Sequence, residues 1–99
     1  MTGLAAIMSG DSQTKWRHDI DALAFQPEGH RGICVVHRLA FRTLMRLVPT
    51  PDACITYFTE QEEAFRASAQ AKISRRRLPP GANFHLTSRD LARALTVAK

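Results

Sequence analysis

The longest amphipathic segment of the chain runs from Thr50 to Arg77, and it constrains the fold more than any other feature. Three helix-start signals stand together. The Thr50 hydroxyl can cap a free backbone N–H, Pro51 suits the first helical position, and the Asp52 carboxylate lies at the positive end of the helix dipole. A proline pair directly after Leu78 ends the segment. We therefore expect one long helix with shorter elements folded around it.

Apolar residues inside this segment recur every three or four positions, which places them along one side of a helix. These residues are Cys54, Phe58, Phe65, Ala69 and Ile73, and Gln61 completes the spacing between Phe58 and Phe65. Acids gather in the first half and bases at the end, as the helix dipole favours. The acids are Glu60, Glu62 and Glu63, and the bases are Lys72, Arg75, Arg76 and Arg77.

Two strand-like segments precede the long helix. Leu23 and Phe25 alternate within residues 21–26, and residues 31–37 are apolar and rich in β-branched side chains. The sequence Pro27-Glu28-Gly29-His30 between them is typical of a turn. A hairpin is therefore expected, followed by a short helix over residues 38–48.

A third strand is predicted over residues 83–86, running into a short C-terminal helix. Thr87 and Asp90 form the pattern of a capping box, a hydroxyl at the N-cap and a carboxylate three residues later. We therefore predict an α+β fold: a small antiparallel sheet, in the order ββααβα, packed against a long amphipathic helix and two shorter helices. Residues 1–15 are expected to be a flexible N-terminal tail and residues 16–99 a single α+β domain. The predicted core is Leu23, Phe25, Ile33, Val35, Phe41, Leu44, Phe58, Phe65, Ile73, Phe84, Leu86, Leu91 and Leu95.

Residues 21–91 resemble the bacterial proteins grouped as domain of unknown function 1488. Members of that family have a strand before a short turn, an apolar strand with a cysteine, a short helix, a long helix, and a late strand running into Asp-Leu. The corresponding features are Leu23-Ala24-Phe25, Gly32-Ile33-Cys34-Val35-Val36, residues 39–47, residues 58–73 and residues 84–91. The resemblance implies an α+β fold and a bacterial origin, and it brings no assigned activity and no catalytic residues.

Composition narrows the class of protein. Ninety-nine residues make at most one domain, and 44% hydrophobic with 23% charged residues is ordinary for a globular chain. The apolar run at residues 4–8 is too short for a secretory signal, and no stretch approaches the roughly 20 apolar residues of a membrane span. Two cysteines are too few for a disulfide framework. A cytoplasmic protein with free thiols and no membrane contact is expected.

Catalytic and metal-binding chemistry find little support in the sequence. Cys34 and His37 are the only close pair of metal-ligand types, and three-residue spacing on a strand points them to opposite faces. A thiol in an apolar strand has its thiolate disfavoured, which argues against Cys34 as a nucleophile. No phosphate-binding glycine loop is present. We expect no enzyme activity, no cofactor, no metal and no small-molecule substrate, with buried thiols and exposed imidazoles.

The arginines are the most informative polar feature, because the net charge is +5 and they are clustered. The candidate anion or nucleic-acid contacts are Arg38, Arg42, Arg46, Arg75, Arg76, Arg77, Arg89 and Arg93. A shared face would bind phosphate along a nucleic-acid backbone. Alternatively, Arg38, Arg42 and Arg46 pair with the acids at residues 60–63.

These alternatives lead to two functional hypotheses. The first is a non-enzymatic protein-interaction or accessory module, with a protein partner or self-association through an uncovered sheet edge. The second is weak, sequence-tolerant nucleic-acid binding through the arginine clusters. Ion pairs with the acids would favour the first hypothesis, and a continuous positive face would favour the second.

Overall fold

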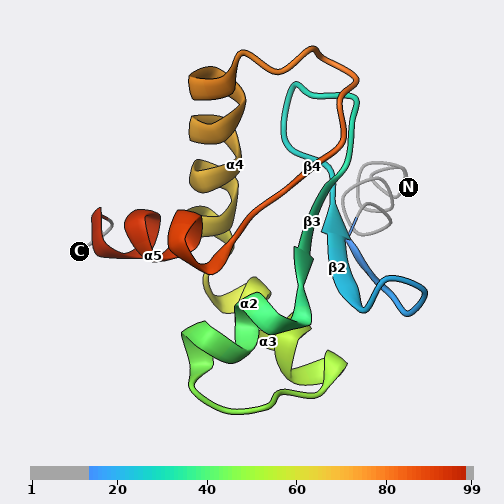
Figure 1. Ribbon diagram of the computed structural model, residues 1–99, viewed down its shortest axis with the longest axis vertical. Helices are drawn as coiled ribbons and strands as arrows, with labels where there is room; N and C mark the ends of the chain where they lie inside the picture. Colours follow the sequence, from blue (N-terminus) through green and yellow to red (C-terminus); the bar gives the residue numbers. More distant parts are fainter. Residues whose placement is uncertain (1–13, 98–99) are drawn as a thin grey trace, which may run out of the picture.

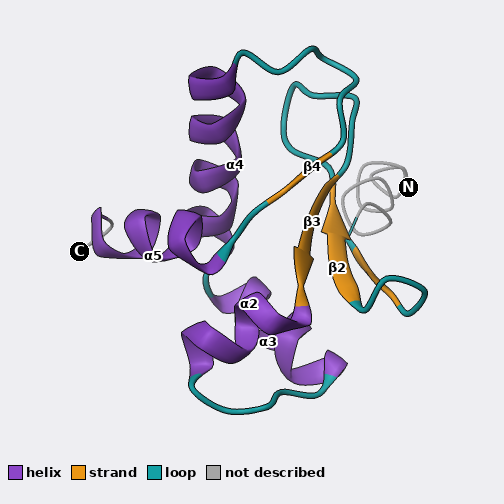
Figure 2. Cartoon of the chain, viewed as in Figure 1, coloured by secondary structure: helices purple, strands orange, loops and turns teal. Residues whose placement is uncertain are grey.

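The computed structural model describes residues 14–97. Helices pack on one side of a sheet, so the overall class is α+β, as expected (Figure 1). The element order is βββαααβα rather than ββααβα (Figure 2). The elements are β1 (Lys15–Arg17), β2 (Ala22–Phe25), β3 (Cys34–His37), α2 (Arg38–Met45), α3 (Pro51–Glu60), α4 (Glu62–Arg76), β4 (Phe84–His85) and α5 (Ser88–Val97). Of the predicted N-terminal tail, residues 1–13 lie outside the described residues.

The sheet is mixed, and the prediction of an antiparallel sheet was wrong in this respect. Its strand order is β1-β2-β3-β4; the first two pairings are antiparallel, and β3 pairs with β4 in parallel. After β3 the chain passes through α2 and α3 and then runs back along the sheet as α4 (Figure 1). It therefore enters β4 from the same end as β3, which is the geometry that a parallel pair needs.

The first strand was not predicted. Lys15–Arg17 is only three residues long, too short to show an alternating pattern. It pairs with β2 so that Trp16 lies opposite Leu23, and Trp16 packs against the core. Lys15, the last residue of the predicted tail, therefore belongs to an edge strand of the sheet.

The expected long helix is two helices, with a break at Gln61. The backbone of Gln61 leaves helical geometry, with φ −113° and ψ 25°. Just before it, the Thr59 hydroxyl donates to the carbonyl of Ile55 at 2.9 Å, a contact that often bends helices. An unbroken helix over residues 51–76 would be about 39 Å long, at 1.5 Å per residue. Such a helix would span nearly the whole 41 Å length of the molecule, whereas the break lets α3 and α4 run in different directions (Figure 1).

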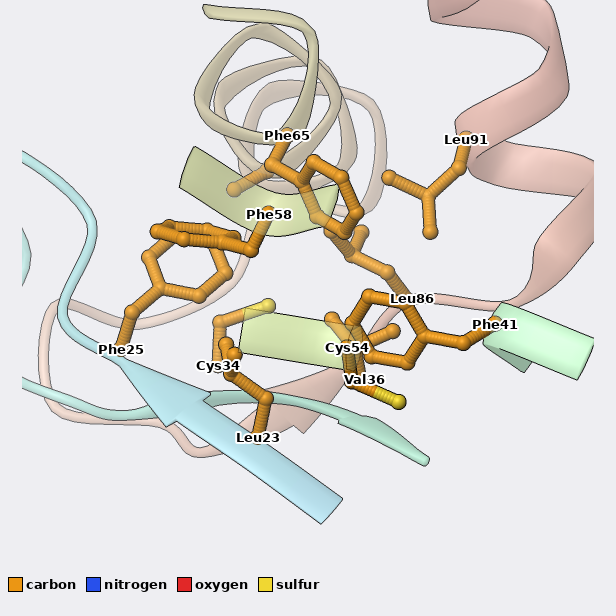
Figure 3. Close-up of a cluster of buried hydrophobic side chains, with 11 residues drawn as sticks. Leu23, Phe25, Cys34, Val36, Phe41, Cys54, Phe58, Phe65, Leu86 and Leu91 are labelled. Atoms are coloured by element: carbon orange, nitrogen blue, oxygen red, sulfur yellow. The ribbon is translucent and has the colours of Figure 1, made fainter. Parts of the chain in front are cut away.

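The core lies between the sheet and the helices. β3 turns toward it the opposite face from the one predicted. Cys34 and Val36 are fully buried, whereas Ile33 and Val35 are partly exposed. Alternation could not select the face, because residues 33–36 are all apolar. Pairing with β2 selects it, since Cys34 lies opposite Phe25 on the core side. Figure 3 shows these sheet residues pointing toward side chains of the helices, among them Phe41, Phe58, Phe65 and Leu91.

Candidate functional site

Arg38 joins the start of α2 to the turn between β1 and β2 rather than to the acids near residue 61. Its Nε donates to Asp21 Oδ2 at 3.0 Å, and Nη1 lies 3.4 Å from the Pro49 carbonyl oxygen. The Arg38 backbone N–H also donates to the Asp21 carbonyl at 3.0 Å. His37, the N-cap of α2, makes no side-chain capping bond, so Asp21 takes over part of that role. Arg38 is therefore a structural residue.

The alternative in which Arg38, Arg42 and Arg46 pair with the acidic segment does not hold among the described residues. Glu62 instead pairs within its own helix, accepting from Arg66 Nε at 2.8 Å. Within residues 14–97, neither Arg42 nor Arg46 has an ionic partner, and none of the acids at residues 60–63 contacts α2 through an ion pair. The positive charge of α2 is therefore not neutralised from α4.

Three large apolar side chains near Arg42 and Arg46 are exposed to solvent. Leu39 is 67% exposed, and Leu47 and Val48 are 51% and 70% exposed. The predicted helix over residues 38–48 ends at Met45, because Arg46 adopts a left-handed conformation with φ 61°, and this leaves Leu47 and Val48 in a loop. Arg42 follows Leu39 by three positions, so the two share one helix face. Arg46, Leu47 and Val48 follow directly after the last helical residue, Met45. We call Leu39, Arg42, Arg46, Leu47 and Val48 the α2 surface.

The remaining candidate arginines lie at the end of α4 and on α5. Arg76 and Arg77 lie at the C-terminal end of α4, and Arg89 and Arg93 lie on α5; all four are exposed. Arg75 approaches Asp90 Oδ1 at 3.7 Å. In Figure 1 the C-terminal end of α4 is at the top and α2 is at the bottom, so Arg76 and Arg77 are remote from Arg42 and Arg46, whereas α5 packs against α2.

Sequence reasoning missed a buried ion pair that joins α4 to α5. Lys72 is only 8% exposed; its Nζ donates to Asp90 Oδ2 at 2.9 Å and to the His85 carbonyl at 2.8 Å. The predicted capping box is confirmed, since the Thr87 N–H donates to Asp90 Oδ2 and the Asp90 N–H donates to Thr87 Oγ1. One signal was available: Lys72 follows Ala69 by three positions, on the apolar side of the helix.

These contacts set the charge of Asp90. Burial alone would raise the pKa of its carboxyl, but the hydrogen bonds from the Thr87 N–H and the Lys72 ammonium lower this pKa to about 2. Asp90 is therefore ionised at neutral pH. The pair acts as a structural clamp between the two helices.

A groove of about 400 Å³ runs beside this clamp, between α4 and α5. Its apolar lining comes from alanines on both helices, Ala64, Ala67, Ala71 and Ala94. Charged residues also line it, namely Glu63, Arg75, Asp90 and Arg93. We call this the α4–α5 groove. It shares no residue with the α2 surface.

The thiols and imidazoles are arranged for packing. Cys34 and Cys54 are free and buried, and burial raises the pKa of Cys34 to about 12 and that of Cys54 to about 11. His30, expected to be exposed, is buried, and its Nε2 lies 2.7 Å from the Ala82 carbonyl oxygen. Among the described residues, no three His, Cys, Asp or Glu side chains are grouped to hold a metal ion.

In the part of the chain that the structure describes, no helix has the length and apolarity that a membrane span requires. No family model matches the chain, and neither the curated proteins nor the solved structures gave a match to it. We therefore infer function from the geometry alone.

Proposed function

We propose that the chain is a small, non-enzymatic protein-interaction or accessory module, and that the α2 surface binds an acidic partner protein. The observation that carries this proposal is the exposure of Leu39, Leu47 and Val48 next to Arg42 and Arg46, which have no ion pair within residues 14–97. Exposed apolar groups in such a position favour an interaction site, since burying them releases about 25 cal/mol per Å² of apolar area. We also propose a cytoplasmic location and membership of the family that the sequence resembles.

Charge gives the partner its chemistry. Arg42 lies on the same helix face as Leu39, and Arg46 follows the helix end directly before Leu47, so a partner that covers the α2 surface meets two guanidinium groups. Carboxylates pair well with guanidinium groups, and opposite charge across an interface speeds association and fixes the register of binding. The expected partner therefore carries apolar residues flanked by Asp or Glu. The raised pKa values of both thiols support a role without nucleophilic chemistry.

A selection from a random peptide library tests this proposal. We expect the chain to enrich peptides that combine apolar residues with Asp or Glu. Their affinity should fall at least about tenfold when Leu39 and Val48 are both changed to Asp, because hot-spot contacts cost about 1–2 kcal/mol or more when lost. Ile20→Asp is the matched control, since Ile20 is also exposed but lies in the β1–β2 turn. Enriched peptides that bind the double variant as well as the wild type would refute the proposal.

Nucleic-acid binding is the second candidate, and a different observation favours it. Six of the eight candidate arginines have no ion pair within the described residues: Arg42, Arg46, Arg76, Arg77, Arg89 and Arg93. Unpaired guanidinium groups are free to contact phosphate. This candidate ranks second because Arg76 and Arg77, at the C-terminal end of α4, are remote from Arg42 and Arg46 at α2 (Figure 1).

Fluorescence anisotropy with labelled DNA and RNA tests the second candidate. Binding should weaken steeply as salt rises. The Arg42→Ala/Arg46→Ala variant should bind more weakly still, and its slope of log K against log[salt] should be smaller by about one to two. Arg38→Ala is a poor probe, because Arg38 is held by Asp21 and its loss would also disturb the fold. Absence of binding even at low salt would end this candidate.

A further inference from the structure

The exposed side of α4 carries a pattern that is complementary to itself. Glu63, Ala67, Ala71 and Arg75 follow one another at four-residue spacing, all are exposed, and all line the α4–α5 groove. The acid and the base stand at opposite ends of this row, and the two alanines stand between them. Position 69 is the midpoint of both the charged pair and the alanine pair.

We propose that a second copy of the chain occupies this groove, with the two α4 helices packed antiparallel about a twofold axis near position 69. In this register Glu63 faces Arg75 of the partner subunit, and Ala67 faces Ala71 of the partner subunit. Reversing the roles of the two copies gives the same contacts, as a twofold interface requires. This inference concerns a different surface from the α2 surface and does not depend on it.

The charges at both ends of the row are available for such contacts. The side chain of Glu63 makes no hydrogen bond or ion pair within residues 14–97, and it is separated from Arg75 by about 18 Å along the helix axis. Arg75 reaches only Asp90, at 3.7 Å, and the other oxygen of Asp90 already accepts from Lys72. Arg75 can therefore turn toward a partner, whereas both hydrogen bonds of Lys72 are needed within the fold.

The alanines decide how closely the helices approach. Interaxial distance between packed helices depends on the side chains at the contact, and small side chains allow the shortest distances. Alanine contributes little apolar area, so this dimer depends on charge more than a leucine-lined interface would. The two edges of the sheet are less suited to self-association than this groove. β1 has three residues and β4 has two, and short edge strands resist pairing with another chain.

Sedimentation equilibrium of the full chain, from about 1 μM to about 1 mM, tests the proposal. The wild type should show a monomer–dimer equilibrium that weakens as salt rises. Glu63→Arg and Arg75→Glu, each measured alone, should weaken the dimer by about tenfold to a hundredfold, since each change creates two like-charge contacts per dimer. An equimolar mixture of the two variants should restore association, because both contacts are then again between opposite charges.

Matched controls separate this interface from a general effect of charge. Glu60→Arg and Arg89→Glu make the same charge changes at exposed positions outside the groove, and they should leave the equilibrium within about twofold of the wild type. Circular dichroism of each variant confirms that it is folded. A wild type that stays monomeric throughout the range overturns the proposal. So does a dimer that survives both charge reversals, or a mixture that fails to associate.

Discussion

Replacing Gly32 by alanine is expected to lower the free energy of unfolding by more than about 3 kcal/mol, or to prevent folding. A Cβ atom at this position would overlap the Ala82 carbonyl oxygen and would lie 2.6 Å from the Ala82 carbonyl carbon and 2.9 Å from the Gly81 oxygen. These neighbours are backbone atoms, so no side-chain rotation relieves the overlap. One of the two chain segments has to move away.

Such a movement would separate the segments that bring β3 and β4 together. The Arg31 N–H donates to the Pro80 carbonyl at 2.7 Å, and the Ile33 N–H donates to Asn83 Oδ1 at 2.8 Å. The first bond of the parallel strand pair, from the Phe84 N–H to the Ile33 carbonyl at 3.1 Å, follows directly. Leaving a buried backbone donor or acceptor without its hydrogen-bond partner costs about 1–3 kcal/mol of stability. Separating these two segments is therefore expected to destabilise the fold.

Urea denaturation measures the effect, and two other glycines provide matched controls. A Cβ at Gly81 would meet no atom within 4 Å, so Gly81→Ala should change stability by less than about 1 kcal/mol. Gly29 has space but a φ of +71°, so Gly29→Ala should cost about 1–2 kcal/mol from backbone strain alone. A Gly32→Ala variant as stable as Gly81→Ala would contradict the close approach of the two segments.

Features set by neighbouring residues could be predicted from the sequence. Thr50 Oγ1 accepts from the Ala53 N–H at 3.1 Å, as its position before Pro51 predicted. The capping box at Thr87 and Asp90 also forms. Both arrangements are completed within three residues, so the rest of the fold has little influence on them.

Features set by distant residues could not be predicted in the same way. The break at Gln61 serves the curvature of α3 and α4 around the core, and the residues near it continue a helical pattern without interruption. The core-facing side of β3 depends on its pairing with β2, and the direction of β4 depends on the course of α4. The candidate surfaces follow the same rule. The exposure of Leu39 and the contact of Lys72 with Asp90, eighteen positions apart, become visible only in the folded chain.

Changing Asp90 to alanine is expected to destabilise the fold by about 3–5 kcal/mol, the cost of breaking a buried ion pair by removing one partner. The Lys72 ammonium would remain buried with only the His85 carbonyl as its partner, and the Thr87 N–H would lose its acceptor. Lys72→Met should cost less, because methionine fills the space and the Asp90 carboxylate keeps the Thr87 N–H and Arg75. The double variant should cost less than the sum of the two, which a double-mutant cycle in urea measures.

The same carboxylate gives the wild type a specific dependence on acid. Because the pKa of Asp90 is about 2 in the folded chain and its ordinary value is 3.8, ionised Asp90 stabilises the fold above about pH 5. This contribution, on the order of 2 kcal/mol, is lost as the pH falls through 3.8 toward 2. The wild type should therefore lose about that much more stability than Asp90→Ala between pH 5 and pH 2. Glu60→Ala, which removes an exposed carboxylate, should follow the wild-type curve within about 0.5 kcal/mol. Parallel curves for the wild type and Asp90→Ala would mean that Asp90 titrates as an ordinary surface acid and that the clamp between α4 and α5 does not form.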